Sequence, residues 1–228
     1  MPSGILALVG GAEFTDGCDF DRSLLDAAGT DQVLVVPTAA AFEHPQRSID
    51  RAVAWFAGLG ATATGLEVYT RRDAMVPAHA DAVRASAFTY LVGANPMHAR
   101  SVFKDSPVWD AIVDAWQQGA TLAGSSAGGQ VLTDPMVDPR GGAFTVGLGV
   151  VAPLAFVPHA DTWSDEKLHR TQSLAAAAIP VVGVPERTAL LRAADGTWST
   201  SGVGDVRVWL DGHPATLDAL PVVADLTD

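Results

Sequence analysis

The segment Gly124-Ser125-Ser126-Ala127-Gly128 is the part of this chain best suited to chemistry. It fits the pattern G-x-S-x-G, in which a serine stands on a sharp turn between a strand and a helix. An apolar strand is expected just before it, at residues 121–124, and a short helix just after it. The two glycines leave room for the turn, so the Ser126 hydroxyl is predicted to project above the carboxyl end of a sheet. There it can attack a carbonyl carbon while the N–H of Ala127 points at the developing oxyanion.

A serine hydroxyl needs a general base, and the chain has six histidines. His159 follows the short apolar run 154–157 and Pro158, which predicts a strand end on the same rim as Ser126. The alternative interpretation is that His159 is a loop residue that only forms a hydrogen bond to the backbone. The other five stand in polar or loop surroundings typical of the surface: His44, His79, His98, His169 and His213.

Several carboxylates could orient the histidine. Asp134 and Asp138 follow the serine turn closely, and Glu186 follows the apolar run 181–184. Asp134 also reads as the first residue of an Asp-Pro turn, and Glu186 as a carboxylate that caps a turn at a strand end. The residues alone leave this choice open.

Strands and helices must position these groups, and hydrophobic periodicity predicts them in the first half of the chain. Helices are expected around residues 49–56 and 109–116, with Pro107 near the start of the second. Short apolar runs that end in Gly or Pro predict buried strands at residues 5–9, 33–36, 90–92 and 121–124. Strands that alternate with helices predict an α/β fold, with a mostly parallel sheet covered by helices on both faces.

The second half is looser. Residues 134–149 are rich in Pro, Gly and Asp, which predicts a long connection or a hairpin, and residues 166–178 have a helical pattern. Short strands, expected to be antiparallel toward the C-terminus, are predicted at residues 181–184, 189–192, 198–201 and 206–210, with turns at Asp195-Gly196 and Asp211-Gly212. No linker or repeat is visible, so we expect a single domain over residues 1–228.

Composition narrows the function classes. Of the 228 residues 48% are hydrophobic and 18% charged, enough for a large core, and the net charge of −12 is the wrong sign for nucleic acid or an anionic membrane surface. Cys18 is the single cysteine, so neither an intrachain disulfide nor a cysteine-based metal cluster is expected. Met1–Gly4 carries no basic residue, and no apolar run approaches the ~20 residues of a membrane span, which predicts a cytoplasmic protein without a signal peptide.

Five segments in order resemble the peptidase E and cyanophycinase family of serine peptidases, whose fold is related to class I glutamine amidotransferases. They lie at residues 4–13, 35–39, 124–128, 157–159 and 182–186, within a resemblance that runs from residue 4 to about 192. The resemblance implies a class I glutamine amidotransferase-like fold, with Ser126 as nucleophile and His159 as general base. It implies Asp134 or Glu186 as the third member, with Asp134 ranked slightly first.

Two places depart from the family pattern. Gly93-Ala94-Asn95-Pro96 stands where family members commonly have Gly-Gly followed by Asp or Asn. The resemblance implies that Gly93 or Ala94 supplies the second oxyanion N–H, with Asn95 beside them at the substrate. Peptidase E also carries an arginine that receives the substrate's aspartyl side chain, and the candidates here are Lys167 and Arg170, which also read as surface cations of a helix. Specificity for N-terminal Asp stays open.

We therefore expect a serine peptidase that hydrolyses small peptides, N-terminal Asp dipeptides among them, with no metal or organic cofactor. Its partner is a small peptide substrate and neither nucleic acid nor membrane, and its oligomeric state is open. One alternative is an α/β-hydrolase-type esterase, in which His213 and either Asp195 or Asp205 would serve Ser126. The other is a non-catalytic binding protein on an amidotransferase-like fold, suggested by the altered Gly93–Pro96 loop.

Overall fold

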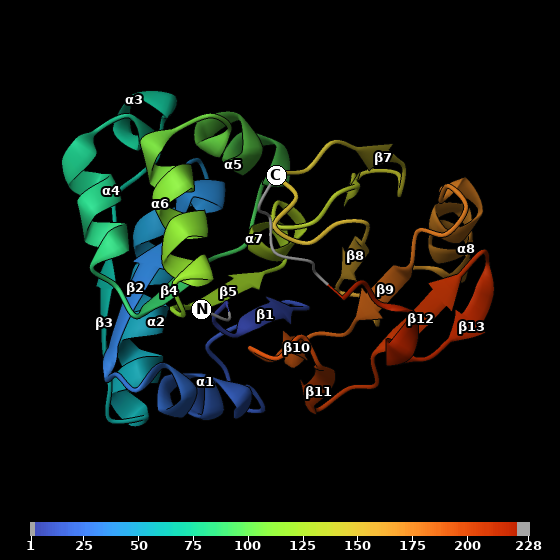
Figure 1. Ribbon diagram of the computed structural model, residues 1–228, viewed down its shortest axis with the longest axis horizontal. Coiled ribbons are helices and arrows are strands. Elements are labelled where there is room, and N and C mark those ends of the chain that lie inside the picture. Colours follow the sequence, from blue (N-terminus) through green and yellow to red (C-terminus); the bar gives the residue numbers. More distant parts are fainter. Residues whose placement is uncertain (1–2, 223–228) are drawn as a thin grey trace.

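The computed structural model describes residues 3–222, which form three sheets, with most helices packed around the parallel strands of the largest one (Figure 1). The largest sheet has seven strands in the order β11-β10-β1-β5-β4-β2-β3. Strands β1 to β5 are mutually parallel, whereas β10 is antiparallel to β1 and β11 is antiparallel to β10. Their bounds are β1 Leu6–Val9, β2 Gln32–Val36, β3 Thr62–Gly65, β4 Phe88–Leu91, β5 Thr121–Ser125, β10 Thr188–Arg192 and β11 Trp198–Gly202.

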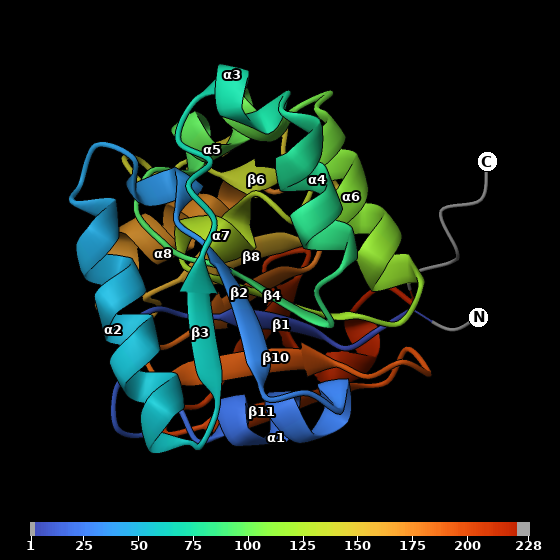
Figure 2. The same cartoon turned by 90° about the vertical axis from the view of Figure 1, so that its left-hand side faces the viewer.

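Helices cover both faces of this sheet (Figure 2). The central strands β1, β4 and β5 are buried on both sides, so alternate side chains enter two separate cores. Ala7 and Val9 of β1 pack in the core on the side of Phe56, whereas Leu6 and Leu8 pack in the core that holds Ile112. The first core lies under α1 (Phe20–Ala28) and α2 (Pro45–Gly58); the second lies under α3 (Arg71–Ala74), α4 (Pro77–Arg84), α5 (Pro96–Phe103) and α6 (Pro107–Gln117). The predicted α/β class is confirmed.

A second sheet, in the order β13-β12-β9-β8, lies beside the first (Figure 1). Strands β8 and β9 are parallel, and β12 is antiparallel to both β9 and β13. The remaining elements are a β6–β7 hairpin, the short α7 that follows β5, and α8. Their bounds are β6 Met136–Val137, β7 Phe144–Thr145, α7 Ala127–Gln130, β8 Ala155–Pro158, α8 Asp165–Leu174, β9 Val181–Val184, β12 Arg207–Leu210 and β13 His213–Ala215, with single 3₁₀ turns η1 at Thr38–Ala40 and η2 at Leu217–Ala219.

Two sequence expectations differ from the structure in detail. The helix expected over residues 166–178 ends at Leu174, because the next residue, Ala175, is extended with ψ 133°. Further on, Ala178 adopts φ 63° and its N–H donates to Asp211 Oδ1 at 2.9 Å. Tertiary contact thus overrides the helix propensity of the alanine run. Val53, expected on the apolar face of α2, is 43% exposed, and Ala52 is buried in its place.

The expected turns and the hairpin in residues 134–149 are present. Among residues 3–222, none of the helices has both the length and the apolar character that crossing a bilayer requires.

Candidate active site

Ser126 occupies a strained turn between β5 and α7. Its backbone has φ 48° and ψ −115°, a conformation that residues other than glycine rarely adopt. Its N–H donates to the carbonyl of Val9 at 2.8 Å. The flanking glycines allow this turn. A Cβ on Gly124 would lie 2.6 Å from the carbonyl oxygen of Gly128, and one on Gly128 would lie 2.2 Å from that of Leu91. The sequence motif therefore forms the strand–turn–helix elbow that was expected.

His159 and Glu186 come together because the strands that precede them are parallel neighbours. Pro158 at the end of β8 is in register with Val184 at the end of β9, so the residues that follow emerge side by side. The backbone N–H of His159 donates to the carbonyl of Gly10 at 2.7 Å, which joins the small sheet to the turn after β1. Gly11 leaves room for the His159 imidazole, which lies where a side chain on residue 11 would be.

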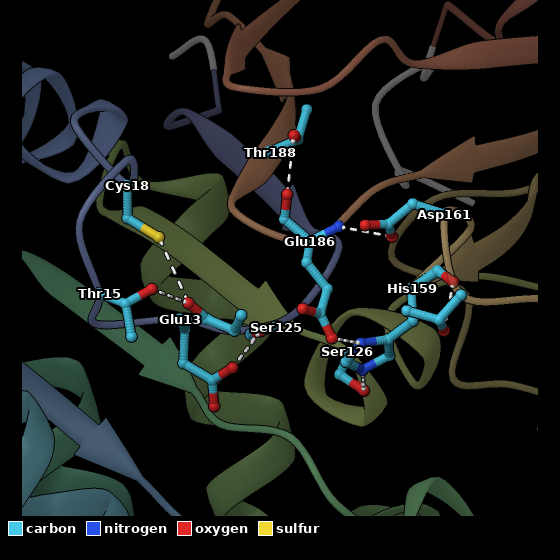
Figure 3. Close-up of polar contacts among 11 residues, drawn as sticks. Glu13, Thr15, Cys18, Ser125, Ser126, His159, Asp161, Glu186 and Thr188 are labelled. Atoms are coloured by element: carbon cyan, nitrogen blue, oxygen red, sulfur yellow. Dashed lines mark hydrogen bonds and ion pairs between the residues drawn. The ribbon is translucent and has the colours of Figure 1, made fainter.

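A continuous chain of hydrogen bonds links Ser126, His159 and Glu186 (Figure 3). Nε2 of His159 is 2.9 Å from Ser126 Oγ, and Nδ1 is 2.8 Å from Glu186 Oε1. With a proton on Nδ1 donated to the carboxylate, Nε2 is free to accept the hydroxyl proton of Ser126. The His159 and Glu186 side chains are 33% and 35% exposed, so the pair borders solvent.

Other contacts hold the Glu186 backbone in place. Its N–H donates to Asp161 Oδ1 at 3.0 Å, and Thr188 Oγ1 donates to its carbonyl at 3.1 Å. The carboxylate therefore extends toward the imidazole from a fixed main chain.

The loop after β4 lies against the serine. A Cβ on Gly93 would be 2.9 Å from Ser126 Cβ. Ala94 has φ 144°, so the chain keeps a glycine-like backbone at the position where the resemblance expected a second glycine. Within the described part of the chain, the N–H groups of Gly93, Ala94 and Ala127 donate to no protein acceptor. All three are available to an oxygen atom of a ligand.

The structure holds several sequence candidates away from this chain of hydrogen bonds. Asp134 Oδ1 accepts the N–H of Gly147 at 2.9 Å, and Asp138 pairs with Arg140 at 2.6 Å. Hydrogen bonding to that guanidinium lowers the pKa of Asp138.

The three candidates for substrate binding are also placed elsewhere. Lys167 Nζ donates to the carbonyl of Pro139 at 2.6 Å and lies 3.6 Å from the centroid of the Trp163 ring, and Arg170 is exposed on α8. Asn95 caps α5 by accepting the N–H of His98 at 3.0 Å.

The residues of the esterase alternative are not gathered around the serine. His213 is exposed on β13, where it pairs with Leu210, and Asp195 caps its own hairpin turn by accepting the N–H of Thr197 at 2.9 Å. Asp205 is exposed between β11 and β12. The imidazole at Ser126 belongs to His159.

A cavity of about 310 Å³ opens beside Ser126. Besides the expected residues, it contains four polar side chains from the segments that follow β1 and β2, which the sequence reasoning missed. The cavity is lined by Glu13, Ala40, Glu43, Ser48, Arg51, Gly93, Ala94, Ser126 and His159. The place of these four polar side chains in the sequence could have indicated them, because they follow predicted parallel strands. Ligands of open α/β sheets bind at the carboxyl ends of such strands. No three His, Cys, Asp or Glu side chains in residues 3–222 are grouped as a metal ion requires.

Comparison with known proteins identifies the family. The sequence matches the model of peptidase family S51 over residues 6–198. The fold is similar to the crystal structure of a peptidase from an acI-B1 Actinobacterium, with a TM-score of 0.78 and 28% identity over 92% of this chain and 91% of that one. A putative peptidase E protein from Listeria monocytogenes EGD-e shares the fold, with a TM-score of 0.64 and 15% identity over 91% of this chain and 98% of that one.

A search of curated proteins finds no match. The family match covers most of the chain and includes the elbow, the histidine strand and the acid strand. The chain belongs to peptidase family S51, the peptidase E family of serine peptidases.

Proposed function

We propose that this protein hydrolyses short peptides by acyl transfer to Ser126, with His159 as general base and Glu186 as the acid that orients it. The observation that carries the proposal is the chain of hydrogen bonds from Ser126 Oγ through both ring nitrogens of His159 to Glu186 Oε1. It supports Glu186 over Asp134, whose carboxylate instead binds the backbone of Gly147.

The reaction follows from this arrangement. Ser126 Oγ attacks the peptide carbonyl carbon while Nε2 of His159 takes the hydroxyl proton. The carbonyl oxygen becomes an oxyanion, which the N–H of Ala127 and one from Gly93 or Ala94 stabilise. The imidazolium, stabilised by Glu186, then gives its proton to the leaving amine as the C–N bond breaks. A water molecule, deprotonated by His159, releases the acyl group as a carboxylic acid and restores the serine.

The cavity favours short substrates. Its volume of about 310 Å³ is at the small end of ligand sites. Arg51 lines it and makes no ion pair with any residue between 3 and 222. We therefore propose that Arg51, in place of Lys167 or Arg170, binds a substrate carboxylate. An N-terminal aspartyl side chain and the chain end of a dipeptide both supply that group.

The test is labelling with a fluorophosphonate probe, read by intact mass, on the wild type and on Ser126→Ala. We expect one label per chain in the wild type and none in the variant. A dipeptide panel with Asp, Glu, Gly or β-linked Asp in first position then defines the substrate. A folded wild type that takes no label between about pH 6 and pH 9 would contradict the proposal and favour a non-catalytic binding protein.

A further inference from the structure

The cavity beside Ser126 contains a carboxylate that the proposed mechanism does not use. Glu13 lies in the segment between β1 and α1 and is only 9% exposed. Its Oε2 accepts the hydroxyl of Ser125 at 2.8 Å (Figure 3). Burial this deep is unusual for a carboxylate without a positive partner.

Glu13 has no such partner among residues 3–222. It makes no ion pair, and the neutral Ser125 hydroxyl is its one hydrogen-bond donor there. Asp21 of α1 lies nearby, and burial, with a smaller contribution from the charge of Glu13, raises its pKa to about 8. Asp21 is therefore mostly protonated at neutral pH.

The position of this carboxylate matches one group of a peptide substrate. Ser125 immediately precedes the nucleophile, so Glu13 is held one residue from Ser126 on the wall of the same cavity. In any peptide the α-nitrogen is two bonds from the carbonyl carbon of its own residue. When the first peptide bond is attacked, that nitrogen is a free ammonium and must lie close to Ser126. A buried carboxylate there supplies charge and hydrogen bonding to it.

We propose that Glu13 binds the free α-ammonium of the substrate's first residue and thereby directs cleavage to the first bond of unblocked short peptides. The inference rests on the proposed function, since it assigns a specificity residue to the same serine site. Ser125 is the positioning residue, because its hydroxyl holds the Glu13 carboxylate toward the cavity.

Paired substrates test this directly. The probes are aspartyl and glycyl p-nitroanilides, each with a free amine and in the N-acetylated form. For the wild type we expect kcat/KM to be at least about 30-fold higher with the free amine. In Glu13→Gln this ratio should fall to within a few-fold of one, through loss on the free-amine substrates alone. Ser125→Ala keeps the Glu13 side chain but removes the hydroxyl that donates to it. Its ratio of kcat/KM should therefore fall between those of the wild type and Glu13→Gln.

Glu43→Gln is the matched control, because it removes one negative charge from the exposed side of the same cavity. We expect it to change the ratio far less than Glu13→Gln does. The fluorophosphonate carries no ammonium, so Glu13→Gln should be labelled at close to the wild-type rate. That result also shows that the variant is folded.

Binding without turnover separates this inference from the proposed function. Calorimetric titration of Ser126→Ala with Asp-Ala and N-acetyl-Asp-Ala should give tighter binding of the free peptide, and adding Glu13→Gln should abolish the difference. Equal binding of both peptides to Ser126→Ala, or an equal loss on free and acetylated substrates in Glu13→Gln, would overturn the assignment. Failure of the wild type to be labelled would refute the serine mechanism and leave the binding comparison decisive for Glu13.

Discussion

Replacing Gly11 by alanine should disable the histidine while leaving the fold in place. The residue has φ +125°, and a methyl group on it would lie 2.1 Å from Cε1 of His159 and 2.6 Å from Nδ1. Restoring an ordinary contact of 3.4 Å requires the ring to move by about 1.3 Å. Its hydrogen bond to Ser126, 2.9 Å long, cannot absorb that shift.

A misplacement of about 1 Å at a reacting group costs about 100-fold in rate. We therefore expect fluorophosphonate labelling of Ser126 in Gly11→Ala to slow by at least about 100-fold. The unfavourable backbone angle should also lower the free energy of unfolding by about 1–3 kcal/mol, which urea denaturation measures.

Gly119→Ala is the matched control for backbone strain. Gly119 has φ +106°, and a methyl group on it would meet nothing within 4 Å. It should lose a similar amount of stability and keep the wild-type labelling rate. If Gly11→Ala were labelled as fast as Gly119→Ala, the close approach of the imidazole to Gly11 would not be what places the base.

Three further predictions concern the acid, the loop after β4 and the buried carboxyl of α1. Glu186→Gln should lower kcat by about 10⁴-fold, because a neutral amide cannot hold the required tautomer, whereas Asp134→Asn should retain most activity; steady-state kinetics on a dipeptide distinguish them. Ala94→Gly should raise the free energy of unfolding by about 1 kcal/mol in urea titrations, because φ 144° strains alanine and not glycine; an unchanged or lower stability would contradict that strain. Burial raises the pKa of Asp21 to about 8 from an ordinary 3.8, so the folded chain keeps a proton that the unfolded chain releases, and stability should fall as pH rises through that interval. Asp21→Asn keeps an acceptor for Trp55 Nε1 and should flatten this pH dependence of stability in thermal melts. A pH dependence as steep as that of the wild type would show that other groups cause it.

The sequence was most informative where hydrophobic period and turn chemistry act together. Strands at residues 33–36, 121–124 and 181–184 were predicted to within one residue, because each is a short apolar run between strong turn signals. Strand β3, Thr62–Gly65, was missed, since three of its four residues are threonine or glycine and it lies at the sheet edge. The single-domain organisation over residues 1–228 stays a prediction.

Local patterns predicted Ser126 and His159 as partners, and the structure places them within hydrogen-bonding distance, whereas the sequence left the acid open between Asp134 and Glu186. Asp134 is close to Ser126 in sequence, whereas Glu186 is placed by the parallel pairing of β8 with β9. That pairing joins segments separated by α8, so no local pattern reports it. The same holds for Glu13, which lies in the loop after β1, and for Arg51, which lies on α2 after β2; both line the cavity. The pairing of strands that are distant in the sequence decides which of several suitable side chains come together.

The division of the proposed triad between two sheets has a consequence for synthesis. Strands β1 to β5 are complete by Ser125, so the five parallel strands of the large sheet and the serine that follows them are made before either partner of that serine exists. At about 5–20 residues per second, the 60 residues from Ser126 to Glu186 take roughly 3–12 s to translate. During those seconds the proposed triad is incomplete, because first His159 and then Glu186 remain to be made. In the proposed mechanism such a peptidase becomes reactive only after translation has passed Glu186, which lies in the C-terminal third of the chain.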